Sequence, residues 1–205
     1  MNHKDLIDEI GHIRSLMEKS SKFMSISGLS GVLIGFYALI GAGTAYAYIY
    51  GGDAVFAYRD QYLNADTIPV FTFIALLVLL ASIVTGYLMA LRKAKQARQS
   101  VWNPASKALL QAMLIPLITG GTISLIFLNN GNYELIAFTL LVFYGLALVS
   151  ASYFSFKELR WLGILDIILG LLALCLPGYG IFFWAAGFGL LHIVYGLIVH
   201  QRYEK

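Results

Sequence analysis

The sequence predicts an all-α protein, a polytopic transmembrane six-helix bundle with an N-terminal cytoplasmic amphipathic helix. Composition is the first observation: hydrophobic residues make up 59% of the 205 residues and charged residues 12%, against about 25% charged in soluble domains. The mean hydropathy of +0.75 is the second. The third is a series of six apolar stretches without the period-two alternation of barrel strands, and helices satisfy their backbone hydrogen bonds inside a bilayer.

The chain divides into three expected parts. Residues 1–25 form the cytoplasmic helix, residues 26–200 the transmembrane domain, and residues 201–205 a cytoplasmic tail. The six spans are expected at about 26–50, 69–91, 108–128, 135–154, 161–176 and 180–199, lengths compatible with the roughly 20 residues that cross a bilayer.

The first 25 residues carry an apolar stripe at helical spacing. Its members are Leu6, Ile10, Ile13, Met17 and Met24. Such a helix rests on the cytoplasmic lipid surface or caps the bundle, the interpretation that we prefer, because the stripe is short for a stable coiled coil. The alternative is a docking stripe for a cytoplasmic protein partner.

Two loops have recognisable local signals. Asn103 and Pro104 have the residue types of a helix cap and a first helical position, so they predict where the third helix begins. Pro177-Gly178-Tyr179-Gly180 predicts a tight turn between the fifth and sixth spans.

The lysines and arginines fix the expected orientation. All but one of the 14 basic residues fall on the side that holds both termini, and the exception, Arg59, lies among aspartates. Basic loops stay in the cytoplasm, so both termini are predicted to be cytoplasmic.

Two ionisable side chains, Asp166 and His192, stand out inside the spans. Counted from the turn at Pro177–Gly180, both lie at nearly the same depth of the last hairpin, so they form a candidate functional polar pair. A hydrogen-bonded pair that locks the hairpin is the structural interpretation. A proton-sensitive switch, a cation site or a proton relay are the functional ones, since histidine titrates near neutral pH.

The third span contains a candidate kink or cavity. Proline followed by two glycines can unwind a membrane helix, which would suit a transporter, although neighbouring helices can also repair a simple kink. The residues are Gln111, Pro116, Thr119, Gly120, Gly121 and Thr122.

Glycines at regular spacing predict close helix packing. Packing inside the bundle is preferred over the alternative, a homo-oligomer interface, because six helices have many internal contacts to make. The glycines are Gly31, Gly35, Gly163, Gly170, Gly189 and Gly196.

Several classes of function lack the residues that they need. No basic soluble surface supports nucleic-acid binding, and the single cysteine, Cys175, excludes an internal disulfide. We expect no cofactor, no metal site and no catalytic residue. Gly28-Leu29-Ser30-Gly31 matches the GxSG of rhomboid proteases, and His192 lies in the last span as theirs does, which makes an intramembrane hydrolase an alternative.

Two stretches, residues 9–42 and 183–199, resemble small six-span integral membrane proteins of bacteria with no named activity. The resemblance covers about a quarter of the chain. It implies a bacterial inner membrane as the location, and it carries over no site residues.

Together these observations predict a non-enzymatic membrane protein whose first partner is the lipid bilayer. The preferred function is a sensing or regulatory module that acts through its cytoplasmic face. The alternative is a small-solute or ion transporter or channel that uses the kinked third span and the Asp166–His192 pair.

Overall fold

A computed structural model describes residues 26–50 and 67–204. In these ranges the chain is helical and contains no strand. The expected N-terminal amphipathic helix, the C-terminal Lys205 and the loop that holds Arg59 lie outside the described residues.

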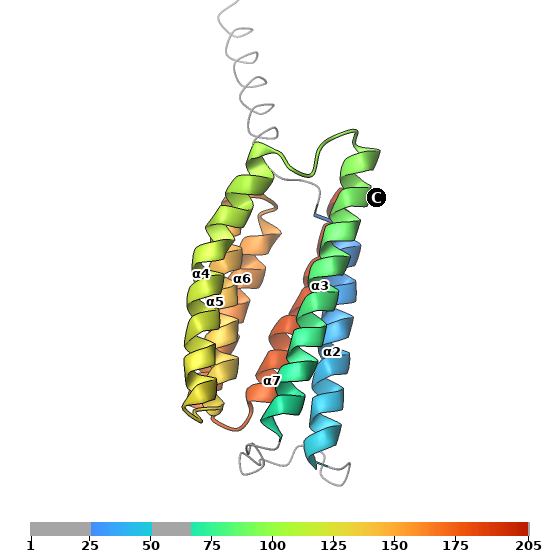
Figure 1. Ribbon diagram of the computed structural model, residues 1–205. Coiled ribbons are helices and arrows are strands. Elements are labelled where there is room, and N and C mark those ends of the chain that lie inside the picture. Colours follow the sequence, from blue (N-terminus) through green and yellow to red (C-terminus); the bar gives the residue numbers. More distant parts are fainter. Residues whose placement is uncertain (1–25, 51–66, 205) are drawn as a thin grey trace, which may run out of the picture.

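In chain order the elements are α2 (Gly28–Tyr50), α3 (Ile68–Gln96), α4 (Pro104–Asn129), α5 (Glu134–Ala151), the 3-10 turn η2 (Ser152–Phe154), α6 (Glu158–Cys175), α7 (Gly180–Trp184), the π-helix η3 (Ala185–Leu191) and α8 (His192–Tyr203). The long helices follow one another in antiparallel directions, and α7, η3 and α8 form one continuous last run (Figure 1).

Five of these helical segments are long and apolar enough to cross a membrane, so the chain is a multi-pass membrane protein. They are α2, α3, α4, the segment from α5 through η2, and the continuous run from α7 to α8. The remaining long helix, α6, is not among these five; it has 18 residues and includes Glu158, Arg160 and Asp166.

The helices pack in two groups. In one, α5 packs between α4 and α6; in the other, α2 packs between α3 and the run formed by η3 and α8 (Figure 1). The groups meet where α6 contacts η3 and α8 and where α5 contacts α7. The outer helices α3 and α4 keep most of their apolar side chains exposed, as lipid-facing helices do.

Glycines allow both inner helix pairs to approach closely. A Cβ at Gly163 of α6 would lie 2.6 Å from the Gly145 oxygen of α5, and a Cβ at Gly35 of α2 would lie 2.6 Å from the Gly189 oxygen of η3. All six glycines singled out in the sequence have such close neighbours in another helix of the same chain.

The local signals act as the sequence predicts. Asn103 caps α4: its Oδ1 accepts from the Ser106 amide at 2.9 Å, while its own amide donates to Ser106 Oγ at 3.0 Å. Pro104 then takes the first helical turn, where no amide is needed. Gly178 has a φ of +88°, which a glycine adopts easily, in the turn between α6 and α7.

The helices bring all described lysines and arginines to one end of the bundle, which we call the basic end. This end holds the first residues of α2, α4 and α6 and the last residues of α3 and α8. Its basic residues are Arg92, Lys93, Lys95, Arg98, Lys107, Lys157, Arg160 and Arg202.

Candidate functional site

The first polar site lies in the core of the bundle, between α5, α6 and the junction of η3 with α8. It contains Asp166, which has no exposed surface, and His192, which is 4% exposed. Burial of both side chains in an apolar bundle is costly unless hydrogen bonds satisfy their polar atoms.

Both ring nitrogens of His192 have partners. Nδ1 lies 2.9 Å from the carbonyl oxygen of Gly187, and Nε2 lies 2.9 Å from the hydroxyl of Tyr144. A carbonyl oxygen only accepts, so Nδ1 carries the hydrogen and donates it; in the neutral ring Nε2 then accepts from the Tyr144 hydroxyl. The arrangement therefore satisfies a neutral imidazole at both nitrogens.

The carboxyl group of Asp166 is different. Neither Oδ1 nor Oδ2 has a hydrogen-bond partner among the described residues. Oδ1 lies against the backbone of Gly187, where a Cβ would be only 2.8 Å from it, and the side chains of Leu141 and Leu169 border the same position. The carboxyl group therefore faces an apolar surface.

The sequence suggested a hydrogen-bonded Asp166–His192 pair, and the structure does not contain that bond. Both residues lie near Gly187, one against its backbone and the other bonded to its oxygen. His192, however, bonds to Tyr144 and to Gly187, so neither of its nitrogens is left for the carboxyl group. The equal depth of the two residues in the hairpin sets only their positions along the helix axes. The rotation of each helix about its own axis decides which side chains meet.

The π-helix η3 lies directly before His192. Its seven residues, Ala185–Leu191, include Gly187 and Gly189, which are both buried against neighbouring helices. A π-helix is rare and costs stability, and short π segments inside α-helices often mark functional positions.

The candidate kink of the third span lies elsewhere. Helix α4 continues through Pro116 as an α-helix from Pro104 to Asn129. Gln111, Thr119 and Thr122 are exposed on its outer surface, and both threonine hydroxyls donate to carbonyls of the preceding turn at 2.8 Å.

The surroundings of the two glycines of that span are also unlike those of residues that line a cavity. Gly120 is buried against the Phe143 side chain of α5, whereas Gly121 has open space at its Cβ position. Thus the candidate kink residues do not join the Asp166–His192 site.

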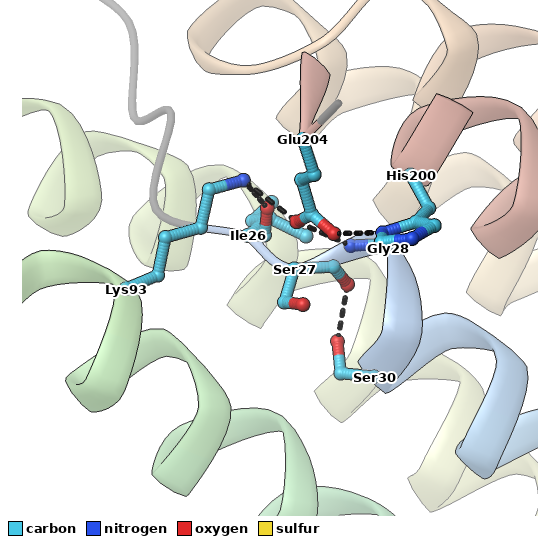
Figure 2. A network of polar contacts seen from close by, with 7 residues as sticks. All are labelled: Ile26, Ser27, Gly28, Ser30, Lys93, His200 and Glu204. Atoms are coloured by element: carbon cyan, nitrogen blue, oxygen red, sulfur yellow. Dashed lines mark hydrogen bonds and ion pairs between the residues drawn. The ribbon is translucent and has the colours of Figure 1, made fainter. Parts of the chain in front are cut away.

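The serine of the GxSG motif has its own local partner. Ser30 Oγ donates to the Ser27 oxygen at 2.6 Å (Figure 2). The nitrogens of His192 bond to Tyr144 and Gly187. A hydrolase would need the histidine to accept from the serine hydroxyl, and that geometry differs from the one seen here.

The second polar site is a network at the basic end, centred on the Glu204 carboxylate (Figure 2). Oε1 accepts from the Gly28 amide and from Lys93 Nζ, each at 2.9 Å, and Oε2 lies 2.6 Å from His200 Nδ1. Lys93 Nζ also donates to the Ile26 oxygen at 2.8 Å. One carboxylate thus joins the start of α2, the last turn of α3 and the end of α8.

Electrostatics favour the charged form of Glu204. Partial burial opposes ionisation, but hydrogen bonds from His200, Lys93 and the Gly28 amide, together with the charge of Lys93, outweigh it and lower the pKa of Glu204 to about 2. Gly28 makes the approach possible, since a Cβ there would collide with the backbone of His200 in α8.

A second ion pair lies beside this network. Arg202 Nη1 bonds to Glu158 Oε1 at 2.6 Å, and the Tyr203 hydroxyl donates to Glu158 Oε2 at 3.1 Å. The Tyr203 ring packs on Phe156, and Lys93 Nζ lies 5.5 Å from the centroid of the Phe156 ring. Two carboxylates, Glu158 of α6 and Glu204 after α8, therefore hold the end of α8 from two sides.

Sequence reasoning missed residues of both sites, among them Tyr144 in the core and Lys93 and Glu204 at the basic end. Tyr144 is one of three hydroxyl side chains in the apolar helix α5, with Thr139 and Ser150, and could have been proposed as a partner for a buried histidine. Lys93 and Glu204 are separated by 111 positions, and no spacing rule connects them.

Among residues 26–50 and 67–204, no three histidine, cysteine or acidic side chains gather as a metal site would require. Comparison of the chain with protein-family models, curated proteins and solved structures found no match. The fold and the two sites define a multi-pass helical membrane protein with a buried polar centre and a charged network at one end.

Proposed function

We propose that this chain is a six-span bacterial inner-membrane protein that works as a sensing or regulatory module through its cytoplasmic face, without enzymatic activity. In this proposal α6 is the fifth span, residues 1–25 form an amphipathic helix, and the basic end faces the cytoplasm with both termini. The concentration of the described lysines and arginines at one end supports that orientation.

The observation that carries the proposal is the Glu204 network. It connects three helix ends through contacts that are partly exposed to solvent, with 24% of the Lys93 side chain and 30% of the His200 side chain accessible. Partly exposed ion pairs are weak, so a modest force or charge change can open them. Ile26, which follows the N-terminal segment directly, accepts one of the Lys93 hydrogen bonds.

A partner that binds residues 1–25 would therefore act on the same lysine that holds α3 against α8. This coupling turns docking at the cytoplasmic face into a displacement of helix ends. A regulatory switch needs such a change at a local contact and an element that has two positions.

Distance measurements between spin labels at Gln99 and Gln201 test the proposal in lipid nanodiscs. Both side chains are exposed at the basic end, close to the ends of α3 and α8. We expect a second, longer distance population in Glu204→Gln, and none in the matched control Glu134→Gln at the opposite end. An identical distance distribution in both variants and the wild type would contradict the proposal.

A second candidate, ion or small-solute transport, is favoured by one observation: the buried Asp166 has no hydrogen-bond partner among residues 26–50 and 67–204. The continuous helix α4 and its outward-facing threonines give this candidate less support than an unwound span would. Proteoliposomes with an internal pH dye and an imposed potential would acidify faster than empty liposomes if the chain carries protons. Equal rates would reject proton transport.

A further inference from the structure

Asp166 combines complete burial with the absence of any hydrogen-bond partner in the described part of the chain. It lies in the middle of α6, on the side that packs against η3, with Oδ1 next to Gly187. A polar group in this position normally has a partner, because an unmet hydrogen bond in an apolar site costs free energy.

The neighbouring elements offer no charge that could compensate a carboxylate. The titratable side chains that pack at this depth are Tyr144 of α5 and His192 and Tyr195 of α8, while α7 and η3 contribute none. Tyr144 and His192 are already bonded to each other, in an arrangement that satisfies their neutral forms. The nearest arginine on α6 itself, Arg160, lies six positions away, which is about 9 Å along the helix.

A metal ion fits this position poorly. Hard cations need about six oxygen ligands, and the backbone oxygen of the neighbouring residue Gly187 already accepts from His192. Leu141 and Leu169 border the remaining space at Gly187. A proton needs no ligand shell and removes the charge that makes burial costly.

We propose that Asp166 is a proton-binding site, whose carboxyl group carries a proton while α6 is packed against η3 and releases it when the two separate. On release, the O–H bond breaks, the electron pair stays on the carboxylate and the proton passes to water. The π-helix supplies the movable element: conversion of its wide turn to α-helix shifts the register by one residue and turns the following face by about 100°.

Gly187 is the residue that permits the packed state. Any side chain there meets Leu141 of α5 and Oδ1 of Asp166. The same glycine fixes His192 through its carbonyl oxygen, so movement of η3 affects the carboxyl group and the imidazole together. This inference does not depend on the Glu204 network, and either proposal can fail without the other.

Infrared spectroscopy of the full chain in lipid nanodiscs at neutral pH tests the proposal. The wild type should show the carbonyl stretch of a protonated carboxyl group, with the expected downshift in heavy water. Asp166→Asn should lose this band, and the control Glu134→Gln should keep it, because Glu134 is exposed at the end of α5. Gly187→Ala should shift the band, since its methyl group displaces the carboxyl group.

A second measurement keeps the test decisive if Asp166→Asn does not fold. Carbon-13 labelling of all aspartates in the wild type should shift the protonated band. The proposal would be overturned if the wild type showed no band of a protonated aspartate, or if the Asp166→Asn variant kept that band.

Discussion

Replacement of Glu204 by glutamine should loosen the basic end while leaving the core intact. Glutamine keeps the size of the side chain and one oxygen acceptor, but it removes the negative charge. Lys93 and His200 then lose a charge-assisted hydrogen bond each. The 2.9 Å contact of Lys93 joins α3 to the end of α8, and the 2.6 Å contact of His200 lies within the end of α8.

The magnitude follows from the pKa of Glu204, which falls from 4.5 to about 2 in the folded chain. At about 1.4 kcal/mol for each pKa unit, the shift corresponds to roughly 3.5 kcal/mol before screening by solvent is considered. Since Lys93 and His200 stay partly exposed, screening reduces the expected loss of unfolding free energy to about 1–2 kcal/mol.

The pH dependence has a definite sign. A lowered pKa means that the unfolded chain binds the proton more readily than the folded chain. The stabilisation by Glu204 is therefore complete above its ordinary pKa of 4.5 and disappears as the pH falls toward 2. The difference between the wild type and Glu204→Gln should shrink over the same interval.

Unfolding in mixed detergent micelles, followed by circular dichroism at several pH values, measures this difference. Glu134→Gln is the matched control, because it makes the same chemical change at the opposite end of the bundle, on an exposed side chain. If Glu204→Gln and Glu134→Gln unfold at the same detergent fraction near neutral pH, the reasoning about the network is refuted.

Three further outcomes are expected. Gly163→Ala should lower the unfolding free energy by about 1–3 kcal/mol, because its Cβ would meet the backbone of α5, whereas Gly121→Ala, with open space at its Cβ position, should change it by less than about 1 kcal/mol; equal effects would contradict the packing argument. Tyr144→Phe should cost about 1–3 kcal/mol of unfolding free energy, since it leaves a buried imidazole nitrogen without its donor, and an unchanged unfolding midpoint would show that this hydrogen bond is unimportant. In a cysteine-free background, a cysteine at Asn130 should react with an impermeant thiol reagent on intact cells and one at Gln99 should not, and the reverse labelling would invert the proposed orientation.

The position of each residue along the axis of its helix could be predicted from the sequence. Hydropathy located the apolar helices because the bilayer sets their length, and Asn103 and Pro104 marked the start of α4 because caps are local interactions. The turn at Gly178 likewise placed Asp166 and His192 at similar depth, since the rise per residue of a helix is constant.

Rotation and long-range contacts were decided only by the tertiary structure. Apolar spans have no polar face that indicates which side points inward. The sequence therefore could not foresee that His192 turns toward Tyr144 and that Asp166 has no partner in the described part of the chain. The close approach of glycine faces sets these rotations, and it depends on two helices at once. Lys93 and Glu204 meet for the same reason: the packing of α2 against α3 and α8 brings together chain ends that no local pattern connects.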